Sequence, residues 1–258
     1  MKIVVLLKEV PDTYGERTLN LETGLAERAG ADNVVDEIGE RSLEVALSYA
    51  DANEGAEVSV LSMAPDGATA SVRKGLAMGA ASATHVADAG LVGADLGLTA
   101  EVLAAALRAE GFDLVIAGNQ STDGAAGMLP VMLSELLQVP ALTNLSTVEI
   151  SADSVSGTRL SDDATMQVTA GLPAVISITE ALPDARFPNF KGIMAAKKKP
   201  LEVKTLADLG VDADDMTPAR SIMLQVAERP PRAAGVKIVD EGDAAQQLAA
   251  FLAENRLV

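Results

Sequence analysis

A polar, glycine-rich loop at residues 118–127 contains the residue types best suited to holding a ligand. It lies between an apolar, strand-like run and a helix-like run at 128–137. Small residues let a ligand approach the backbone, and Gly124 and Gly127 permit dihedral angles that other residues resist. N–H groups at the start of the next helix are able to bind a phosphate, aided by the helix dipole. The loop itself contains neither Lys nor Arg, which favours holding a phosphate through neutral donors over phosphoryl transfer; a ligand-free tight turn is the alternative.

A basic segment at residues 186–204 stands out on this acidic chain, with six cationic residues against the single acid Glu202. Phe187 and Phe190 flank Pro188 in a stretch where we expect no regular structure to bury them. An exposed aromatic ring flanked by cations is a typical anchor for protein docking. The alternative is that both rings fold back onto the sheet while the lysines remain solvated.

Composition excludes several kinds of site. The chain has no cysteine and a single histidine, His85, which excludes cysteine nucleophiles, thiolate-bound zinc and iron–sulfur clusters. His85 falls in a strand-like run, so we expect a structural side chain held by a nearby carbonyl. The 37 acidic and 20 basic residues give a net charge of −17, which argues against nucleic-acid binding. The usual dinucleotide and P-loop glycine motifs are missing from the sequence.

The chain is long enough to bury a sizeable core, with 258 residues of which 48% are hydrophobic. Its first apolar run meets a charge at Lys8, too early for the centre of a signal peptide, and no later run of about 18 apolar residues is uninterrupted. We therefore expect a cytoplasmic protein without direct membrane insertion.

Strand-like and helix-like segments alternate as far as Pro140. Apolar and β-branched runs predict strands, and helical spacing of apolar residues predicts helices. The strands are expected at 3–7, 57–63, 84–87 and 113–117, and the helices at 40–52, 68–78 and 98–109. This alternation predicts an α/β fold with a mostly parallel sheet and helices on both faces, of the adenine-nucleotide-binding, universal-stress-like type. Ligands of such sheets lie at the carboxyl ends of the strands.

The pattern changes after Pro140. Short segments rich in Thr, Ser and Val predict an antiparallel meander, followed by a buried strand, an extended arm and an amphipathic terminal helix. These segments are 148–150, 154–160 and 166–170 for the meander, 174–178 for the strand, 181–200 for the arm and 242–256 for the helix.

Five short motifs, in this order, resemble the β subunit of an electron transfer flavoprotein nearly from end to end. They are Lys8-Glu9-Val10-Pro11-Asp12, Leu76-Ala77-Met78-Gly79, Gly118-x-Gln120-x-x-Asp123-Gly124, Leu172-Pro173-Ala174-Val175 and Ile193-Met194-Ala195-Ala196-Lys197-Lys198-Lys199. The resemblance implies a heterodimer with an FAD-carrying α subunit. That heterodimer passes electrons from acyl-CoA dehydrogenases of fatty acid oxidation, or other flavin dehydrogenases, to a membrane quinone reductase.

In such a pair this chain is an electron-carrier subunit and not an enzyme, with no catalytic residue and no metal site. The resemblance implies that it holds AMP structurally; in electron-bifurcating relatives the pocket holds a second FAD, and an empty pocket is the third possibility. It further implies an α/β nucleotide-binding domain at 1–180 with an antiparallel extension from about 145, a basic recognition arm at 181–204, and a C-terminal arm and helix at 205–258. The last of these contacts the α subunit, and residues 232–237 resemble the segment that embraces it.

The resemblance also assigns site residues. Those placed around the nucleotide are Leu6, Lys8, Asp36, Glu37, Ile38, Gly39, Met63, Gly118, Gln120, Ser121, Asp123, Gly124, Ala125, Gly127, Met128 and Leu129. Those that dock the partner dehydrogenase are Phe187, Phe190, Lys191, Ile193 and Met194.

The chain departs from the family pattern at three places. Asp36-Glu37 stands where Asn-Pro is common, and a carboxylate there could contact adenine or ribose but would repel a phosphate. Residues 127–129 replace polar residues at the end of the loop, and Phe190 stands where relatives tend to carry Leu. A different function class, a stand-alone ATP-binding regulator of universal-stress type, shares the predicted sheet but leaves the basic arm and the tail unexplained.

Overall fold

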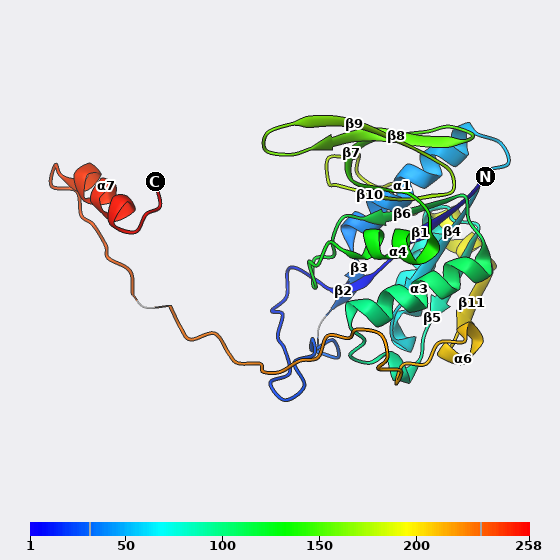
Figure 1. Ribbon diagram of the computed structural model, residues 1–258, viewed down its shortest axis with the longest axis horizontal. Helices are drawn as coiled ribbons and strands as arrows, with labels where there is room; N and C mark the ends of the chain where they lie inside the picture. The colour runs from blue at the N-terminus through cyan, green and yellow to red at the C-terminus, as the bar shows by residue number, and fades with distance from the viewer. Residues whose placement is uncertain (31, 233) are drawn as a thin grey trace. The chain divides into compact units, whose positions relative to one another are not determined.

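A nine-stranded sheet forms the centre of the first of two compact units, Met1–Leu224 and Gln225–Val258 (Figure 1). The computed structural model describes residues 1–30, 32–232 and 234–258. The strand order is β11-β5-β4-β1-β6-β10-β7-β8-β9. The strands are β1 (Lys2–Leu6), β4 (Glu57–Met63), β5 (Ser82–Val86), β6 (Leu114–Gly118), β7 (Ala141–Ile150), β8 (Ser154–Leu160), β9 (Thr165–Gly171), β10 (Ala174–Ile178) and β11 (Leu201–Lys204).

Seven neighbouring strands, from β11 to β7, are parallel, while β8 and β9 continue the sheet as an antiparallel hairpin beyond β7 (Figure 1). This arrangement confirms the predicted α/β class, the mostly parallel sheet and its small antiparallel extension. A separate antiparallel pair consists of β2 (Glu9–Pro11) and β3 (Asn33–Val35).

Helices cover both faces of the sheet, as the sequence predicts. They are α1 (Glu37–Ala52), α2 (Thr69–Met78), α3 (Leu96–Glu110), α4 (Leu129–Leu137), α5 (Phe190–Ala196) and α6 (Leu206–Leu209), with 3-10 turns at Asp66–Ala68 and Ala89–Leu91. On one face Ile3 packs in a core with Leu43 of α1, and on the other Val4 packs with Val102 of α3. Because alternate residues of β1 face opposite cores, its residues 3–6 are all apolar, and full burial of each such side chain contributes about 1.5–3 kcal/mol.

The predicted extended arm at 181–200 is wrong over residues 190–196, which form α5. Asn189 begins this helix by accepting a hydrogen bond from the Gly192 N–H at 2.8 Å. The basic segment also ends in a strand that the sequence analysis missed, β11, which pairs in parallel with β5 at the edge of the sheet. An asparagine N-cap was the available signal for the helix, and Pro188 and Gly192 obscured it.

The predicted short strand at 148–150 is the end of the ten-residue β7. Asn144 has a positive φ of 56°, and the register with β10 shifts nearby, between Ile176 and Ile178. This irregularity breaks the alternation that identifies strands in a sequence, so the first half of β7 escaped detection.

His85 lies buried in β5, with Nε2 3.0 Å from the carbonyl oxygen of Ala64. This contact confirms its interpretation as a structural side chain. Across the described ranges, no helix combines the length and the apolarity needed to cross a bilayer.

The second unit contains α7 (Ala244–Glu254), which lies within the helix predicted at 242–256. Leu248 and Phe251 on this helix are each about half exposed, at 52% and 50%. Ala233, inside the segment 232–237 that resembles the α-embracing region, lies outside the described residues.

Candidate functional site

A cavity of about 580 Å³ lies at the carboxyl ends of the central parallel strands. Leu6, Met63 and Gly118 are the last residues of β1, β4 and β6, and all three line it. The loop 118–127 forms part of the same wall. The cavity therefore occupies the place where open α/β sheets bind their ligands.

Twelve of the sixteen residues predicted around the nucleotide line this cavity. They are Leu6, Lys8, Asp36, Ile38, Gly39, Met63, Gly118, Gln120, Ser121, Gly124, Gly127 and Leu129. Glu37, Asp123, Ala125 and Met128 are not among the lining residues. Glu37 and Met128 are exposed at the starts of α1 and α4, while Asp123, within the loop, is only 11% exposed at its side chain.

The backbone of the loop differs in one respect from the expectation. Gly127 adopts the left-handed φ of 66°, as predicted, but the second such residue is Ala125, with φ 47°, and not Gly124. Gly118 is required by close approach, because a Cβ there would lie 2.5 Å from Cγ2 of Ile38. At Gly124 a Cβ would meet only ordinary contacts, 3.5 Å from Ser121 Oγ.

Cations from distant segments meet at this loop, although the loop has none of its own. Lys8 Nζ lies 2.7 Å from Asp123 Oδ1, and Arg28 Nη2 lies 2.9 Å from Asp123 Oδ2. Lys8 and Arg28 line the cavity, whereas the carboxylate between them does not. Two cations from outside the loop therefore stand at the cavity wall, whose lining also includes the acids Glu9, Asp36 and Asp88. The preference for neutral phosphate donors stays a prediction.

The pKa values of Asp123 and Asp36 are shifted in opposite directions. Burial alone would raise the pKa of Asp123, but hydrogen bonds from Lys8 and Ser121 outweigh it and hold that pKa well below its usual value. Burial raises the pKa of Asp36, and the hydrogen bond from the Thr122 N–H offsets only part of the effect.

Asp36 lines the cavity but is held by its contacts with the loop. Its Oδ2 accepts the Thr122 N–H at 2.8 Å, its Oδ1 is buried without a hydrogen-bond partner, and the residue is 2% exposed. A buried carboxylate with a raised pKa repels a phosphate less than a carboxylate with the usual pKa would. Its role in this structure is to hold the loop.

Several residues of the site were missed from the sequence. Arg28 and Arg17 lie in a connection without periodicity, and Arg17 donates to the Thr122 carbonyl at 2.5 Å. Residues 88–99, from the loop after β5 to the first turn of α3, supply a further part of the cavity wall. Neither stretch contains a motif, so only tertiary structure brings them to the loop.

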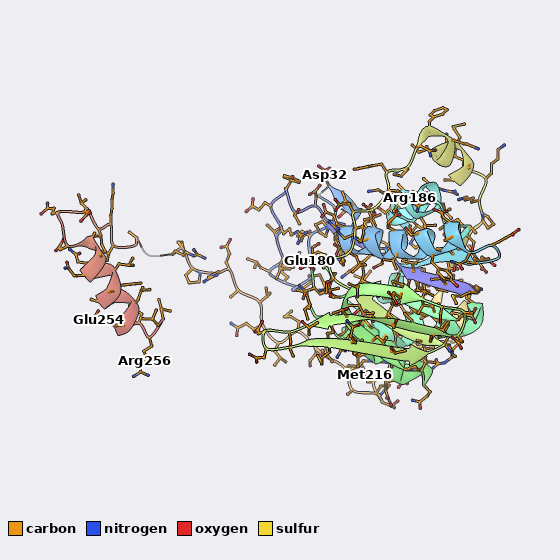
Figure 2. All side chains as sticks on the ribbon, turned by 90° about the horizontal axis from the view of Figure 1, so that it is seen from above. Asp32, Glu180, Arg186, Met216, Glu254 and Arg256 are labelled. Atoms are coloured by element: carbon orange, nitrogen blue, oxygen red, sulfur yellow. The ribbon has the colours of Figure 1, made fainter. Side chains whose placement is uncertain are left out.

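The residues predicted to dock a partner lie on a second, separate surface. Phe187 and Phe190 are 95% and 79% exposed, so the alternative in which both rings fold back onto the sheet is wrong. Lys191, Ile193 and Met194 are exposed on the same short helix, and Figure 2 shows this helix, in pale olive, protruding from the body with its side chains extending outward.

The helix α5 is held firmly although its apolar side chains are exposed. Arg73 of α2 donates to the Ala196 carbonyl at 3.0 Å. Arg186, which precedes this helix in the chain and is labelled in Figure 2, forms a two-pronged ion pair with Glu44 of α1. The distance between Arg186 Nε and Glu44 Oε2 is 2.8 Å. A helix fixed by such contacts loses less conformational entropy when its exposed side chains bind a partner.

Comparison with known proteins places this arrangement in a family. A family profile described as Electron transfer flavoprotein domain matches residues 23–209. The chain is 44% identical over 264 residues to the Electron transfer flavoprotein subunit beta of Mycobacterium tuberculosis (strain ATCC 25618 / H37Rv), covering 99% of each chain. It is 30% identical over 250 residues to that of Bacillus subtilis (strain 168), covering 96% of this chain and 94% of the relative.

A third relative has a different printed name. The Caffeyl-CoA reductase-Etf complex subunit CarD of Acetobacterium woodii is 31% identical over 215 residues, covering 83% of this chain and 82% of the relative. The domain match and the identity to these relatives extend over most of the chain. The chain therefore belongs to the electron transfer flavoprotein family, as a member of its beta-subunit branch.

Proposed function

We propose that this chain is the nucleotide-holding and docking subunit of a two-subunit electron transfer flavoprotein, with AMP in the cavity and FAD in the partner α subunit. The observation that carries the proposal is that Lys8 and Arg28, held by Asp123, line a cavity beside the small-residue loop 118–127, at the carboxyl ends of the strands. The chain works in the cytoplasm as an electron-carrier subunit and not as an enzyme in its own right.

The chemistry of the cavity suits a mononucleotide. Lys8 and Arg28 would attract the phosphate, and Gly124 leaves room beside Ser121 for close approach. Apolar side chains such as Leu6 and Met63 would accept the faces of a base. AMP bound there would supply structural support and no redox chemistry.

The exposed surface of α5 supports the proposed partners. Phe187 and Phe190 would anchor an acyl-CoA dehydrogenase or another flavin dehydrogenase, with Lys191 favouring an acidic rim on that protein. Electrons would then pass through the FAD of the α subunit to a membrane quinone reductase. The stand-alone ATP-binding regulator is disfavoured because family membership accounts for the exposed basic segment and the C-terminal unit.

The first experiment is coexpression with a matching α subunit, followed by mass spectrometry of the small molecules released on denaturation. We expect a yellow one-to-one complex that releases AMP and FAD in equal amounts. Two FAD per complex and no AMP would mean that this cavity holds a second FAD instead of AMP. A colourless chain loaded with ATP, without affinity for the α subunit, would overturn the proposal.

A substitution then locates the nucleotide. Gly124→Val places a branched side chain beside Ser121 Oγ and Lys8 Nζ, 3.5 and 3.8 Å from the new Cβ. Because Gly124 does not need a positive φ, we expect the variant to fold and the complex to lose AMP. Full AMP content in a folded variant would contradict this placement. Gly67→Val is the control, because a Cβ at Gly67 meets nothing within 4 Å, its φ is not positive, and it does not line the cavity.

A further inference from the structure

Residues 217–224 of the first unit, here called the strap, are fixed to α3 by a two-pronged ion pair. Arg220 Nη1 lies 2.7 Å from Glu101 Oε1, and Nη2 lies 2.8 Å from Oε2. The Arg220 side chain is only 6% exposed, against 29% for Glu101. A guanidinium fork of this kind fixes orientation as well as position, which a lysine ammonium does not.

A second contact fixes the strap to the first turn of the same helix. Asp95 is the N-cap of α3, and its Oδ1 accepts the Leu98 N–H at 2.8 Å. Its other oxygen, Oδ2, accepts the Ser221 N–H at 2.6 Å. One carboxylate thus joins the helix start to the strap. The two are closely packed, since a Cβ on Gly97 would lie 3.4 Å from the Ala219 carbonyl oxygen.

The strap also touches the turn between the bridged residues Leu19 and Ala26. A Cβ on Gly24, in this turn, would lie 2.8 Å from Cγ of Met223. Gly24 has a φ of 71°, so it satisfies both the turn and the close approach. The strap therefore holds two segments that are far apart in the chain.

Both of these segments are walls of the cavity. The lining residues that they supply are Leu25, Ala26, Leu96, Thr99 and Leu103. None of the lining residues comes from the strap. The strap therefore contacts two wall segments of the cavity without lining the cavity itself.

We propose that the strap positions this wall of the cavity and that Arg220 is its main positioning residue, so that ligand affinity depends on a residue that does not touch the ligand. The proposal rests on the nucleotide function proposed above. In physical terms, loosening the first two turns of α3 lets the wall sample positions in which it no longer contacts the ligand, and the population of the binding-competent wall falls.

The test compares Arg220→Gln with the wild-type full chain by calorimetric titration with AMP and by hydrogen exchange without nucleotide. We expect AMP to bind about fivefold more weakly, at the low end of typical coupling between separate sites. Exchange should rise in residues 96–99 of the nucleotide-free variant. Arg220→Lys keeps the charge without the fork, and we expect it to restore affinity only in part.

Arg186→Gln is the matched control, because Arg186 forms the same kind of fork, on Glu44, outside the cavity. It should lower the free energy of unfolding without changing AMP affinity. Unchanged AMP affinity in Arg220→Gln, or unchanged exchange in 96–99, would overturn the role of the strap. If the wild-type chain binds no AMP, the nucleotide proposal fails, and exchange in 96–99 still decides whether the strap positions the wall.

Discussion

Lys8 Nζ lies 2.7 Å from Oδ1 of Asp123, although 115 residues separate the two in the chain. Arg28 completes the cluster from a third segment, 2.9 Å from the other carboxylate oxygen. The carboxylate therefore fixes two cations at the cavity wall and leaves part of their charge for a ligand. The predictions below begin with this cluster.

Asp123→Asn removes the negative charge between the two cations. We expect it to destabilise the full chain by about 1.5 kcal/mol at pH 7, the lower range for a hydrogen bond to a charged group. Because the pKa of Asp123 is lowered in the folded chain, its contribution is complete above about pH 4, the usual Asp value, and is lost as the pH falls through the lowered pKa. Urea unfolding at several pH values measures the difference, and a difference that shrinks between pH 7 and pH 5 would contradict this origin.

Asp36→Asn should act in the opposite direction. Burial raises the pKa of Asp36, so its ionised form costs stability above that raised pKa, and the cost disappears as the pH falls toward the usual Asp value. An Asn oxygen can still accept the Thr122 N–H. We expect the variant to be more stable than the wild type at pH 8, by less than about 2 kcal/mol, and equal to it near pH 4. Lower stability of the variant at pH 8 would show that the hydrogen bond from the Thr122 N–H depends on the negative charge of Asp36.

Gly118→Ala tests the close approach beside the loop. The added methyl would meet Ile38 Cγ2 at 2.5 Å, and overpacking of this kind typically costs about 1–3 kcal/mol. Gly124→Ala is the control, since its Cβ meets only ordinary contacts. Thermal unfolding of both variants measures the effect, and equal stability would mean that Ile38 moves aside without cost.

Phe190→Ala tests the docking surface. Because this side chain is 79% exposed, we expect stability, flavin content and AMP content of the complex to remain unchanged. A docking anchor typically contributes at least about 2 kcal/mol, so affinity for the acyl-CoA dehydrogenase should fall about 30-fold, with slower electron delivery. Leu160→Ala, also at an exposed apolar side chain (58%) on β8, is the control. Loss of cofactor from Phe190→Ala would assign it a structural role.

The fold class and the location of the loop follow from local patterns in the sequence. Buried parallel strands need apolar residues at successive positions, as in β1, and helices need apolar residues at 3.6-residue spacing, as in α3; both patterns are local. The ordered motifs likewise identify the family, because they survive as short contiguous segments.

The ion pairs at the cavity and the contacts of the strap became visible only in the folded structure. Lys8, Arg28 and Asp123 come from three segments, and no local pattern states which cation meets which acid. No local pattern reveals the ion pair of Arg220 either, because its partner Glu101 lies 119 residues away in the chain. Periodicity records which face of an element is buried, whereas ion pairs depend on distances that exist only after the sheet has brought its loops together.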